Sequence, residues 1–225
     1  MSVIQAQAAG NSTQFRAVLF DLGGVVFPSP FDAFDAYEKE EGLSTGFVRA
    51  VIARSAEGGA WARLERSDVT FEEFCSELEG EALLAGEEIS AKQLMAMVGS
   101  SLTPRQEMVA AINALRSIGL LIGALTNNWA LAGGRTDARP HSLGNLGLFD
   151  IVVESAVEGM RKPDPRIYEL TCERLGVEPA EVVFLDDLGI NLKPARAMGM
   201  TTIKVADVGD ALAELGEVFG ISLHY

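Results

Sequence analysis

Five short apolar runs recur along the chain, and stretches with helical periodicity separate most of them. The runs cover residues 15–20, 120–126, 149–153, 182–186 and 201–205. Short runs that are apolar on both faces are typical of buried strands. Strands that alternate with helices pair in parallel and are joined by right-handed crossovers. The pattern therefore predicts an α/β fold whose core is a Rossmann-like, doubly wound parallel sheet.

Three of the separating stretches carry helix start and stop signals. We expect helices over residues 103–117, 164–175 and 191–198. In the first of them, Thr103 and Gln106 have the spacing of a capping box, and a glycine follows each of the three stretches. These helices would supply the crossover connections that a parallel sheet needs.

The first two predicted strands lie much farther apart in the sequence than the others. One βα unit needs about 30 residues, whereas the whole of residues 21–119 separates these two strands. Aromatic residues near the start of this interval repeat at helical spacing. We therefore expect a core of residues 15–28 and 102–225, a helical cap over residues 29–101, and a mobile leader over residues 1–14. Phe31, Arg54, Trp61 and Arg63 could reach a substrate from this cap, although packing or a surface position is the more common role of such residues.

Polar residues follow four of the predicted strands. In chain order they are Asp21 and Gly23, Thr126 and Asn127, Lys162, and finally Asp186, Asp187 and Asn191. Because parallel strands all end at one edge of a sheet, these residues are expected to share one crevice. The adjacent carboxylates of Asp186 and Asp187 would repel each other unless a lysine or a metal ion lay close by. We therefore interpret the set as one site rather than as unrelated turns.

The residue types in this set suit phosphate chemistry. Carboxylates are ligands for a hard cation such as Mg²⁺, and a carboxylate can also act as a nucleophile. A lysine and a threonine hydroxyl can hold phosphoryl oxygens, where negative charge has to be stabilised. His141 and His224 are isolated, and the chain has no zinc-ligand spacing, P-loop or GxSxG motif.

Charge and composition exclude several kinds of partner. The chain has 18 basic and 32 acidic residues and a net charge of −14, so we expect no nucleic-acid partner and no membrane binding. Its two cysteines, Cys75 and Cys172, lie in apolar helical stretches, which suits a reducing compartment. The N-terminus has no signal-peptide pattern, so a cytoplasmic protein is expected. The sequence does not specify an oligomeric state.

The motifs resemble those of a known superfamily. The segments FDLGGVVFPSP, LTNNW, RKPDPRIYE and FLDDLGINLKPARAMGM occupy residues 20–30, 125–129, 161–169 and 184–200. Their order, with an insertion after the first strand, resembles the haloacid dehalogenase-like (HAD) hydrolases that carry a C1 cap. Within that superfamily the segments look similar to the N-terminal phosphatase domain of soluble epoxide hydrolase. The resemblance runs from about residue 16 to the end of the chain.

The resemblance implies roles for the residues at the first three strand ends. Asp21 matches the nucleophile, which is also a metal ligand. Thr126 and Asn127 match the phosphate-binding second motif, and Lys162 matches the lysine that neutralises the nucleophile and the phosphoryl group. The implied reaction is the Mg²⁺-dependent hydrolysis of a phosphomonoester through an aspartyl-phosphate. The implied substrate is a small phosphorylated metabolite or a lipid phosphate.

The resemblance also implies a Mg²⁺ site. Asp187 matches the metal ligand of the fourth motif, and Asp186 falls beside it as a supporting acid. Asn191 falls where a second acid of that motif often lies. Asp21 and the backbone carbonyl of Gly23 would complete the set of protein ligands.

Gly23 departs from the pattern of the family. At this position, two residues after the nucleophile, the family phosphatases have a second aspartate that protonates the leaving alcohol and then activates water. General acid–base catalysis typically contributes about 10² to 10⁴ in rate. Three alternatives therefore stay open: a phosphatase that manages without this acid, a catalytically degenerate binding protein, and a haloacid-type dehalogenase. The pair Asp186–Asp187 argues against the dehalogenase, because that chemistry needs no metal.

Overall fold

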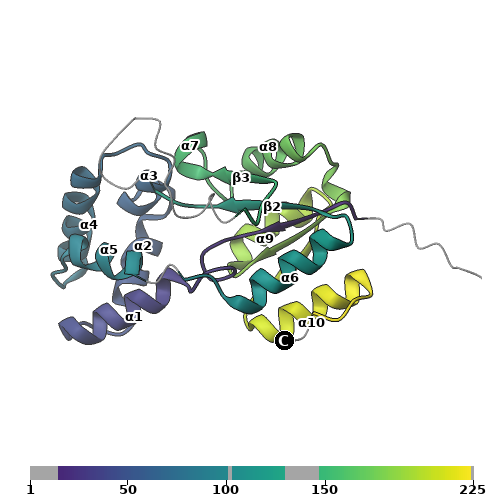
Figure 1. The fold of residues 1–225 in the computed structure, drawn as a ribbon. Helices are drawn as coiled ribbons and strands as arrows, with labels where there is room; N and C mark the ends of the chain where they lie inside the picture. Colours follow the sequence, from purple (N-terminus) through teal and green to yellow (C-terminus); the bar gives the residue numbers. More distant parts are fainter. Residues whose placement is uncertain (1–14, 101–102, 130–146, 224–225) are drawn as a thin grey trace, which may run out of the picture.

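The computed structural model describes residues 15–100, 103–129 and 147–223. At the centre of this described part is a sheet of five strands, which are β1 (Ala17–Phe20), β2 (Leu121–Thr126), β3 (Ile151–Glu154), β4 (Val182–Asp186) and β5 (Thr201–Lys204). Their order across the sheet is β3-β2-β1-β4-β5, and every neighbouring pair is parallel (Figure 1). The predicted doubly wound α/β sheet is thus confirmed. The predicted leader, His141 and His224 lie outside the described residues.

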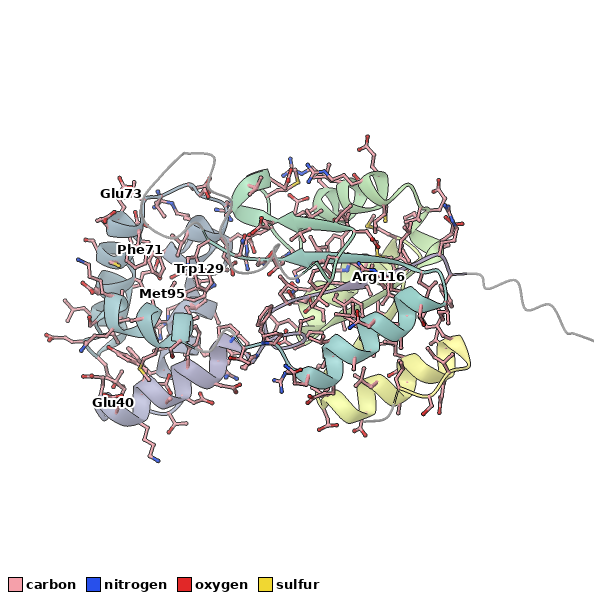
Figure 2. All side chains as sticks on the ribbon, viewed as in Figure 1. Glu40, Phe71, Glu73, Met95, Arg116 and Trp129 are labelled. Carbon is pink, nitrogen blue, oxygen red and sulfur yellow. The ribbon has the colours of Figure 1, made fainter. Side chains whose placement is uncertain are left out.

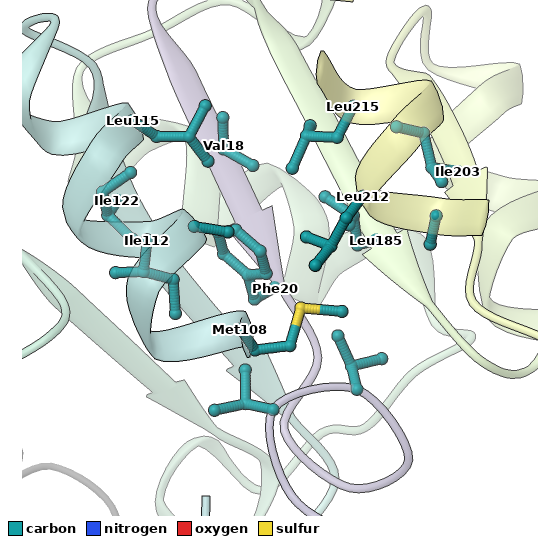
Figure 3. Close-up of a cluster of buried hydrophobic side chains, with 14 of the residues drawn as sticks. Val18, Phe20, Met108, Ile112, Leu115, Ile122, Leu185, Ile203, Leu212 and Leu215 are labelled. Carbon is teal, nitrogen blue, oxygen red and sulfur yellow. The ribbon is translucent and has the colours of Figure 1, made fainter. Parts of the chain in front are cut away.

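Helices cover both faces of the sheet. They are α6 (Gln106–Ser117) and α10 (Val208–Phe219) on one face, and α8 (Pro165–Leu175) and α9 (Gly189–Ala197) on the other. Two short elements, α7 (Ser155–Glu158) and η3 (Pro179–Glu181), precede α8 and β4. Val18 and Phe20 of β1 pack with α6 and α10 (Figure 3), whereas Leu19 packs with α8 and α9. Burial of each such side chain contributes about 1.5–3 kcal/mol, so both faces anchor β1 at the centre.

Helix α6 begins at Gln106 rather than at Thr103, so the predicted capping box does not form at its start. The backbone N–H of Arg105, directly before the helix, donates to the carbonyl of Val26 at 2.8 Å. This bond ties the segment to the loop after β1, and tertiary docking thereby overrides the local capping signal. Helix α8 is capped by Asp164, whose side chain accepts a hydrogen bond from the backbone N–H of Arg166 in the first turn.

A helical insertion lies between β1 and β2. In the described residues it contains α1 (Pro30–Glu41), α2 (Phe47–Ser55), η1 (Ala56–Gly58), α3 (Ala60–Glu65), α4 (Phe71–Ala85) and α5 (Ala91–Ser100). Its apolar side chains form a hydrophobic cluster of their own, separate from the two that flank the sheet. Thr70 and Glu73 form a capping box at the start of α4. Figure 1 shows the insertion beyond the end of the sheet towards which β1 runs. Its role as a cap stays a prediction.

Both cysteines are buried and neither forms a disulfide, as expected for small apolar residues. Burial raises the pKa of the Cys172 thiol to about 11, so this thiol stays protonated and unreactive at neutral pH. Among the described residues, no helix combines the length and the apolar character that crossing a membrane would require.

Candidate active site

The ends of β1 and β4 bring two carboxylates together. Asp21 directly follows β1, and Asp186 is the last residue of β4. The strands pair with Phe20 opposite Leu185, and the backbone N–H of Asp21 donates to the carbonyl of Leu185 at 2.8 Å. Asp21 and Asp186 therefore lie side by side at the carboxyl edge of the sheet, which is where folds of this kind bind ligands.

The side chain of Lys162 is fully buried between these carboxylates. Its Nζ lies 2.9 Å from Asp21 Oδ1 and 2.7 Å from Asp186 Oδ2, and it donates a third bond to the carbonyl of Leu125 at 2.9 Å. These contacts use all three ammonium hydrogens. Burial alone lowers the pKa of Lys162, but the Asp186 and Asp21 carboxylates outweigh it and hold this pKa above its usual value. Lys162 is therefore a fixed cation.

Asp186 is occupied by donors from its own loop. Its Oδ1 accepts hydrogen bonds from the backbone N–H of Leu188 at 2.8 Å and from Nδ2 of Asn191 at 3.0 Å, while its Oδ2 accepts from Lys162. Asp186 and Asn191 are both buried. A carboxylate with this many donors is held firmly in one orientation. The supporting role predicted for Asp186 and Asn191 stays a prediction, and these contacts are its structural basis.

Asp187 completes a cluster of three carboxylates. One oxygen from each of Asp21, Asp186 and Asp187 lies within 4.8 Å of the others. Burial, together with the two neighbouring carboxylates, raises the pKa of Asp21 well above its usual range, and burial and Asp186 raise the pKa of Asp187 to about 6. Lys162 lowers both values and Lys204 also lowers that of Asp187, but within the described residues these cations do not offset burial and the neighbouring carboxylates. The excess negative charge fits a divalent cation held by Asp21 and Asp187, because Asp186 is already occupied.

This cluster predicts that stability falls as the pH rises. The folded-state pKa of Asp187, about 6, lies above the value of about 4 for an unfolded aspartate. The contribution of Asp187 is therefore fully present below about pH 4 and is lost as the pH rises through about 6. In EDTA, wild type should lose about 1–2 kcal/mol relative to Asp187→Asn between these limits, after allowance for partial exposure. Urea unfolding measures this difference, and a difference independent of pH would contradict the prediction.

The end of β2 supplies a hydroxyl and two amides. Thr126 is buried at the last position of the strand. The Asn127 side chain donates to the carbonyl of Lys162 at 3.0 Å and accepts from its backbone N–H at 2.8 Å. The backbone N–H of Asn128 donates to the hydroxyl of Ser155 at 2.9 Å. The Asn127 side chain thus holds the Lys162 loop, and the phosphate-binding role predicted for Asn127 stays a prediction.

Two glycines follow Asp21, and they differ in what an added side chain would meet. Gly23 has an ordinary φ, and a Cβ at this position would lie 3.4 Å from the Cδ of Pro30. Gly24 has a φ of +79°, and its Cβ would overlap the Asp187 carboxylate. The fold therefore requires glycine at position 24 but not at position 23. The predicted role of the Gly23 carbonyl as a metal ligand stays a prediction.

A matched pair of variants tests this reading of the loop. Gly24→Ala should lower the free energy of unfolding by about 2–5 kcal/mol, because it combines backbone strain with overlap at Asp187. Gly23→Ala should stay within about 1 kcal/mol of wild type, because its backbone conformation suits an alanine. Urea denaturation of both variants gives the comparison, and equal losses would show that the two positions are equivalent.

Ion pairs tie the loop that carries Lys162 to the helical insertion. Arg161, the residue before Lys162, lies 2.9 Å from Oε1 of Glu57 and 2.7 Å from Oε2 of Glu65. Glu57 is exposed, whereas Glu65 is buried. No pattern in the sequence points to either glutamate, because isolated acids in a chain with 32 acidic residues carry no local signal.

Two tryptophans meet at the same boundary. The ring centroids of Trp61, in α3, and Trp129, two residues after Asn127, are 5.5 Å apart. Figure 2 shows Trp129 where the core meets the insertion. Of the residues predicted to contact substrate, Trp61 thus lies near the loops of the site, whereas Arg63 is paired with Glu77 inside the insertion at 2.6 Å. Trp129 directly follows the second motif, and this adjacency is the sequence signal for it.

The parallel sheet and the carboxylates gathered at its carboxyl edge define an α/β protein whose candidate active site lies at the strand ends. The family model for haloacid dehalogenase-like hydrolases matches residues 15–199, which is most of the chain. The chain therefore belongs to the haloacid dehalogenase-like hydrolases, and it is an enzyme of that family, as the motifs predicted.

Similar proteins include parts of larger ones. The chain is 35% identical to acyl-CoA dehydrogenase family member 10 of Mus musculus over 93% of this chain and 20% of that protein. It is 36% identical to bifunctional epoxide hydrolase 2 of Sus scrofa over 92% of this chain and 39% of that protein, so it spans less than half of either relative. Phosphatase MT3486 of Mycobacterium tuberculosis is 32% identical over 82% of this chain and 84% of that protein. A HAD family enzyme from Bacteroides thetaiotaomicron, solved with magnesium and inorganic phosphate, shares the fold with a TM-score of 0.59 and 23% identity over 84% of this chain and 93% of that one.

Proposed function

We propose that the chain is a Mg²⁺-dependent phosphomonoester hydrolase that forms an aspartyl-phosphate on Asp21. The observation that carries this proposal is the contact of Asp21 with the fully buried Lys162, at 2.9 Å, beside the Asp187 carboxylate. Lys162 and a bound cation together would offset the burial that raises the pKa of Asp21, so that this carboxylate attacks in its ionised form. The similarity to phosphatase MT3486, which covers most of both chains, supports a phosphate ester as substrate.

The residues of the site divide the proposed reaction between them. Asp21 attacks the phosphorus, the alcohol leaves, and water then hydrolyses the aspartyl-phosphate to inorganic phosphate and free Asp21. Lys162 stabilises the negative charge shared by Asp21 and the phosphoryl oxygens. The Thr126 hydroxyl and the backbone N–H of Asn127 hold the other phosphoryl oxygens. Because attack is in line, the leaving oxygen lies on the far side of the phosphorus from Asp21.

The carboxylate cluster fits Mg²⁺, which prefers oxygen ligands and is usually held by one or two carboxylates. Asp21, Asp187 and the carbonyl of Gly23 would hold the ion. Asp186 would instead hold Lys162 in place through their ion pair. When bound, the ion supplies positive charge that neutralises the phosphoryl oxygens. The unbalanced charge of the three carboxylates is the structural support for this assignment.

The proposed substrate is a small phosphorylated metabolite or a lipid phosphate. A net charge of −14 repels such anions over the whole surface, so positive charge within the site has to capture them. Lys162 and the metal ion would provide it. The helical insertion would act as the cap, and Trp61 at its boundary with the core would contact the group that leaves.

Gly23 favours a second candidate function. A protein with this fold but without the usual aspartate two residues after the nucleophile would bind phosphate compounds with little turnover. A haloacid-type dehalogenase is a weaker candidate, because it would leave the charge of the Asp21, Asp186 and Asp187 cluster unbalanced.

Release of inorganic phosphate from p-nitrophenyl phosphate and from a set of alkyl phosphates tests the proposal. We expect release with Mg²⁺, loss of release in EDTA, and recovery when Mg²⁺ is restored. Release that persists in EDTA would reject the metal dependence. Phosphate binding by calorimetry without turnover of any ester would identify the binding protein, and chloride release from 2-chloropropionate would identify the dehalogenase.

A further inference from the structure

Glu65, the last residue of α3, is a buried carboxylate to which the reaction above gives no role. Its exposed fraction is 6%. Its Oε1 accepts a hydrogen bond from Nε1 of Trp61 at 2.9 Å. Its Oε2 and Nε of Arg161 lie 2.7 Å apart, yet both atoms are buried and neither makes a hydrogen bond within the described residues. Buried polar atoms rarely stay unpaired, so this pair is suited to bonding a third polar group.

The surroundings of Glu65 place it beside the proposed phosphate site. Its ion-pair partner, Arg161, directly precedes Lys162, whose Nζ contacts Asp21. Its hydrogen-bond partner, Trp61, packs against Trp129, which follows the second strand end (Figure 2). Glu65 therefore belongs to the insertion but contacts the loop before Lys162 directly and the loop after β2 through Trp61.

The charged groups around Glu65 act in opposite directions. Burial raises the pKa of Glu65, and the nearby Glu57 adds to this effect. The Arg161 guanidinium, the hydrogen bond from Trp61 and the charge of Lys162 lower it, but burial outweighs them. A carboxyl group whose pKa is raised can hold a proton closer to neutral pH and is suited to general acid catalysis.

We propose that Glu65 is the general acid and base of this enzyme and that it replaces the aspartate that the family has at the position of Gly23. The inference rests on the proposed phosphatase function. It follows from the in-line geometry, since Asp21 attacks from the core and the leaving oxygen must point away from it. Glu65 lies on the insertion beside the loop that carries Lys162, and its Oε2, 2.7 Å from Nε of Arg161, makes no hydrogen bond within the described residues.

The proton balance of the two steps is complete with this residue. In the first step, the Asp21–phosphorus bond forms and the ester P–O bond breaks, and the leaving oxygen takes the electron pair of that bond and the proton of Glu65. In the second step, the ionised Glu65 takes a proton from the water that attacks the phosphorus, and Asp21 leaves as a carboxylate. The products are the alcohol and inorganic phosphate, and Glu65 is protonated again.

Glu65→Gln tests the role, because the amide keeps the size of the side chain and its bond to Trp61 but carries no transferable proton. With alkyl phosphates, which need protonation of the leaving oxygen, we expect kcat to fall by about 10² to 10⁴. With p-nitrophenyl phosphate, whose leaving group needs little help, the fall should be less than about fivefold. A plot of rate against leaving-group pKa should therefore be steeper for the variant, and the high-pH limb of the alkyl phosphate profile should disappear.

Glu57→Gln is the matched control, because Glu57 also pairs with Arg161 but is exposed. It should leave both classes of ester unchanged. Equal losses of kcat on alkyl and aryl esters in Glu65→Gln would show a structural role and overturn the inference. An unchanged kcat on both classes of ester would also overturn it. If Glu65→Gln fails to fold, Glu65→Asp serves instead, and only a loss selective for alkyl esters upholds the role. Failure of wild type to hydrolyse p-nitrophenyl phosphate would reject the phosphatase proposal itself, which is a separate outcome.

Discussion

Asp21→Asn should hydrolyse phosphomonoesters at least about 10³-fold more slowly than wild type and yet unfold at a higher temperature in the absence of metal. The loss of activity follows from the proposed role, because an amide cannot form the aspartyl-phosphate. The gain in stability follows from the geometry. The Asp21 carboxylate is buried beside Asp186 and Asp187, and these surroundings raise its pKa, so its ionised form opposes folding at neutral pH.

An amide at position 21 removes that penalty and keeps the local contacts. Its oxygen can still accept the hydrogen bond from the backbone N–H of Leu22, which is 2.6 Å long in wild type, and can still face Lys162. Lys162 then balances Asp186 alone. We expect the free energy of unfolding to rise by about 1 kcal/mol and the melting temperature by about 2–4 °C in a chain of this size. Such a gain in stability at the expense of activity is common for substitutions in active sites.

Thermal unfolding at pH 8 in EDTA, together with the phosphate-release assay, measures both effects. Asp35→Asn is the control, because Asp35 is exposed and its ion pair with Arg49 is long, at 3.8 Å. That control should leave activity and melting temperature unchanged. Added Mg²⁺ should raise the melting temperature of wild type more than that of Asp21→Asn, because the variant lacks one ligand. A variant that retains activity would show that Asp21 is not the nucleophile.

The residues of the core site could be found from the sequence because topology places them. Asp21, Thr126 and Asp186 follow or end strands, and Lys162 follows another strand at a short distance. In a parallel sheet, strand ends share an edge whatever the details of packing, so recognising the strands was sufficient. The position of the helical insertion could also be predicted, since a single βα unit is far shorter than the interval between β1 and β2.

Contacts made across the boundary between core and insertion could not be found in this way. Glu65 reaches Arg161 only because α3 packs next to the loop before Lys162, and no local pattern in the sequence encodes that approach. The sequence predicts that α6 begins at Thr103 rather than at Gln106 for a similar reason, since the backbone N–H of Arg105 donates to a loop more than seventy residues earlier in the chain. Local signals describe an element, whereas the docking of one element on another depends on side chains that are distant in sequence.

The hydrogen bonds of Asn127, in the second motif, could not be predicted from the sequence either. The place of Asn127 in the second motif predicts phosphate binding, and this stays a prediction. In the structure, its side chain also makes two hydrogen bonds with the backbone of Lys162, and it therefore positions the lysine. Asparagine side chains bond backbone groups readily, but the sequence does not show which backbone group is near.

Lys162→Met should lower kcat/KM by about 10² to 10³ and the free energy of unfolding at pH 8 by about 3–5 kcal/mol. Lys162 is the cation in contact with both Asp21 and Asp186, and its side chain is fully buried. Methionine fills the same space without the charge, so two carboxylates lose their partner. The pKa of Asp21, which burial already raises, should rise further without Lys162, and stability that depends on its protonated form is lost as the pH rises. The gap between variant and wild type should therefore be smaller at pH 5 than at pH 8.

Two further variants distinguish the effect of the Lys162 charge from the effect of its shape. Lys162→Arg keeps the charge, but a guanidinium is larger and cannot direct three hydrogen bonds to Asp21, Asp186 and the carbonyl of Leu125 from one atom. It should restore part of the stability at pH 8 and little of the activity. Lys193→Met, on the exposed side of α9, should change neither. Lys162→Met could instead lose less than threefold in activity and leave the pH dependence of unfolding unchanged. That result would mean that a group other than Lys162 neutralises the carboxylates, and it would contradict the proposed role of Lys162.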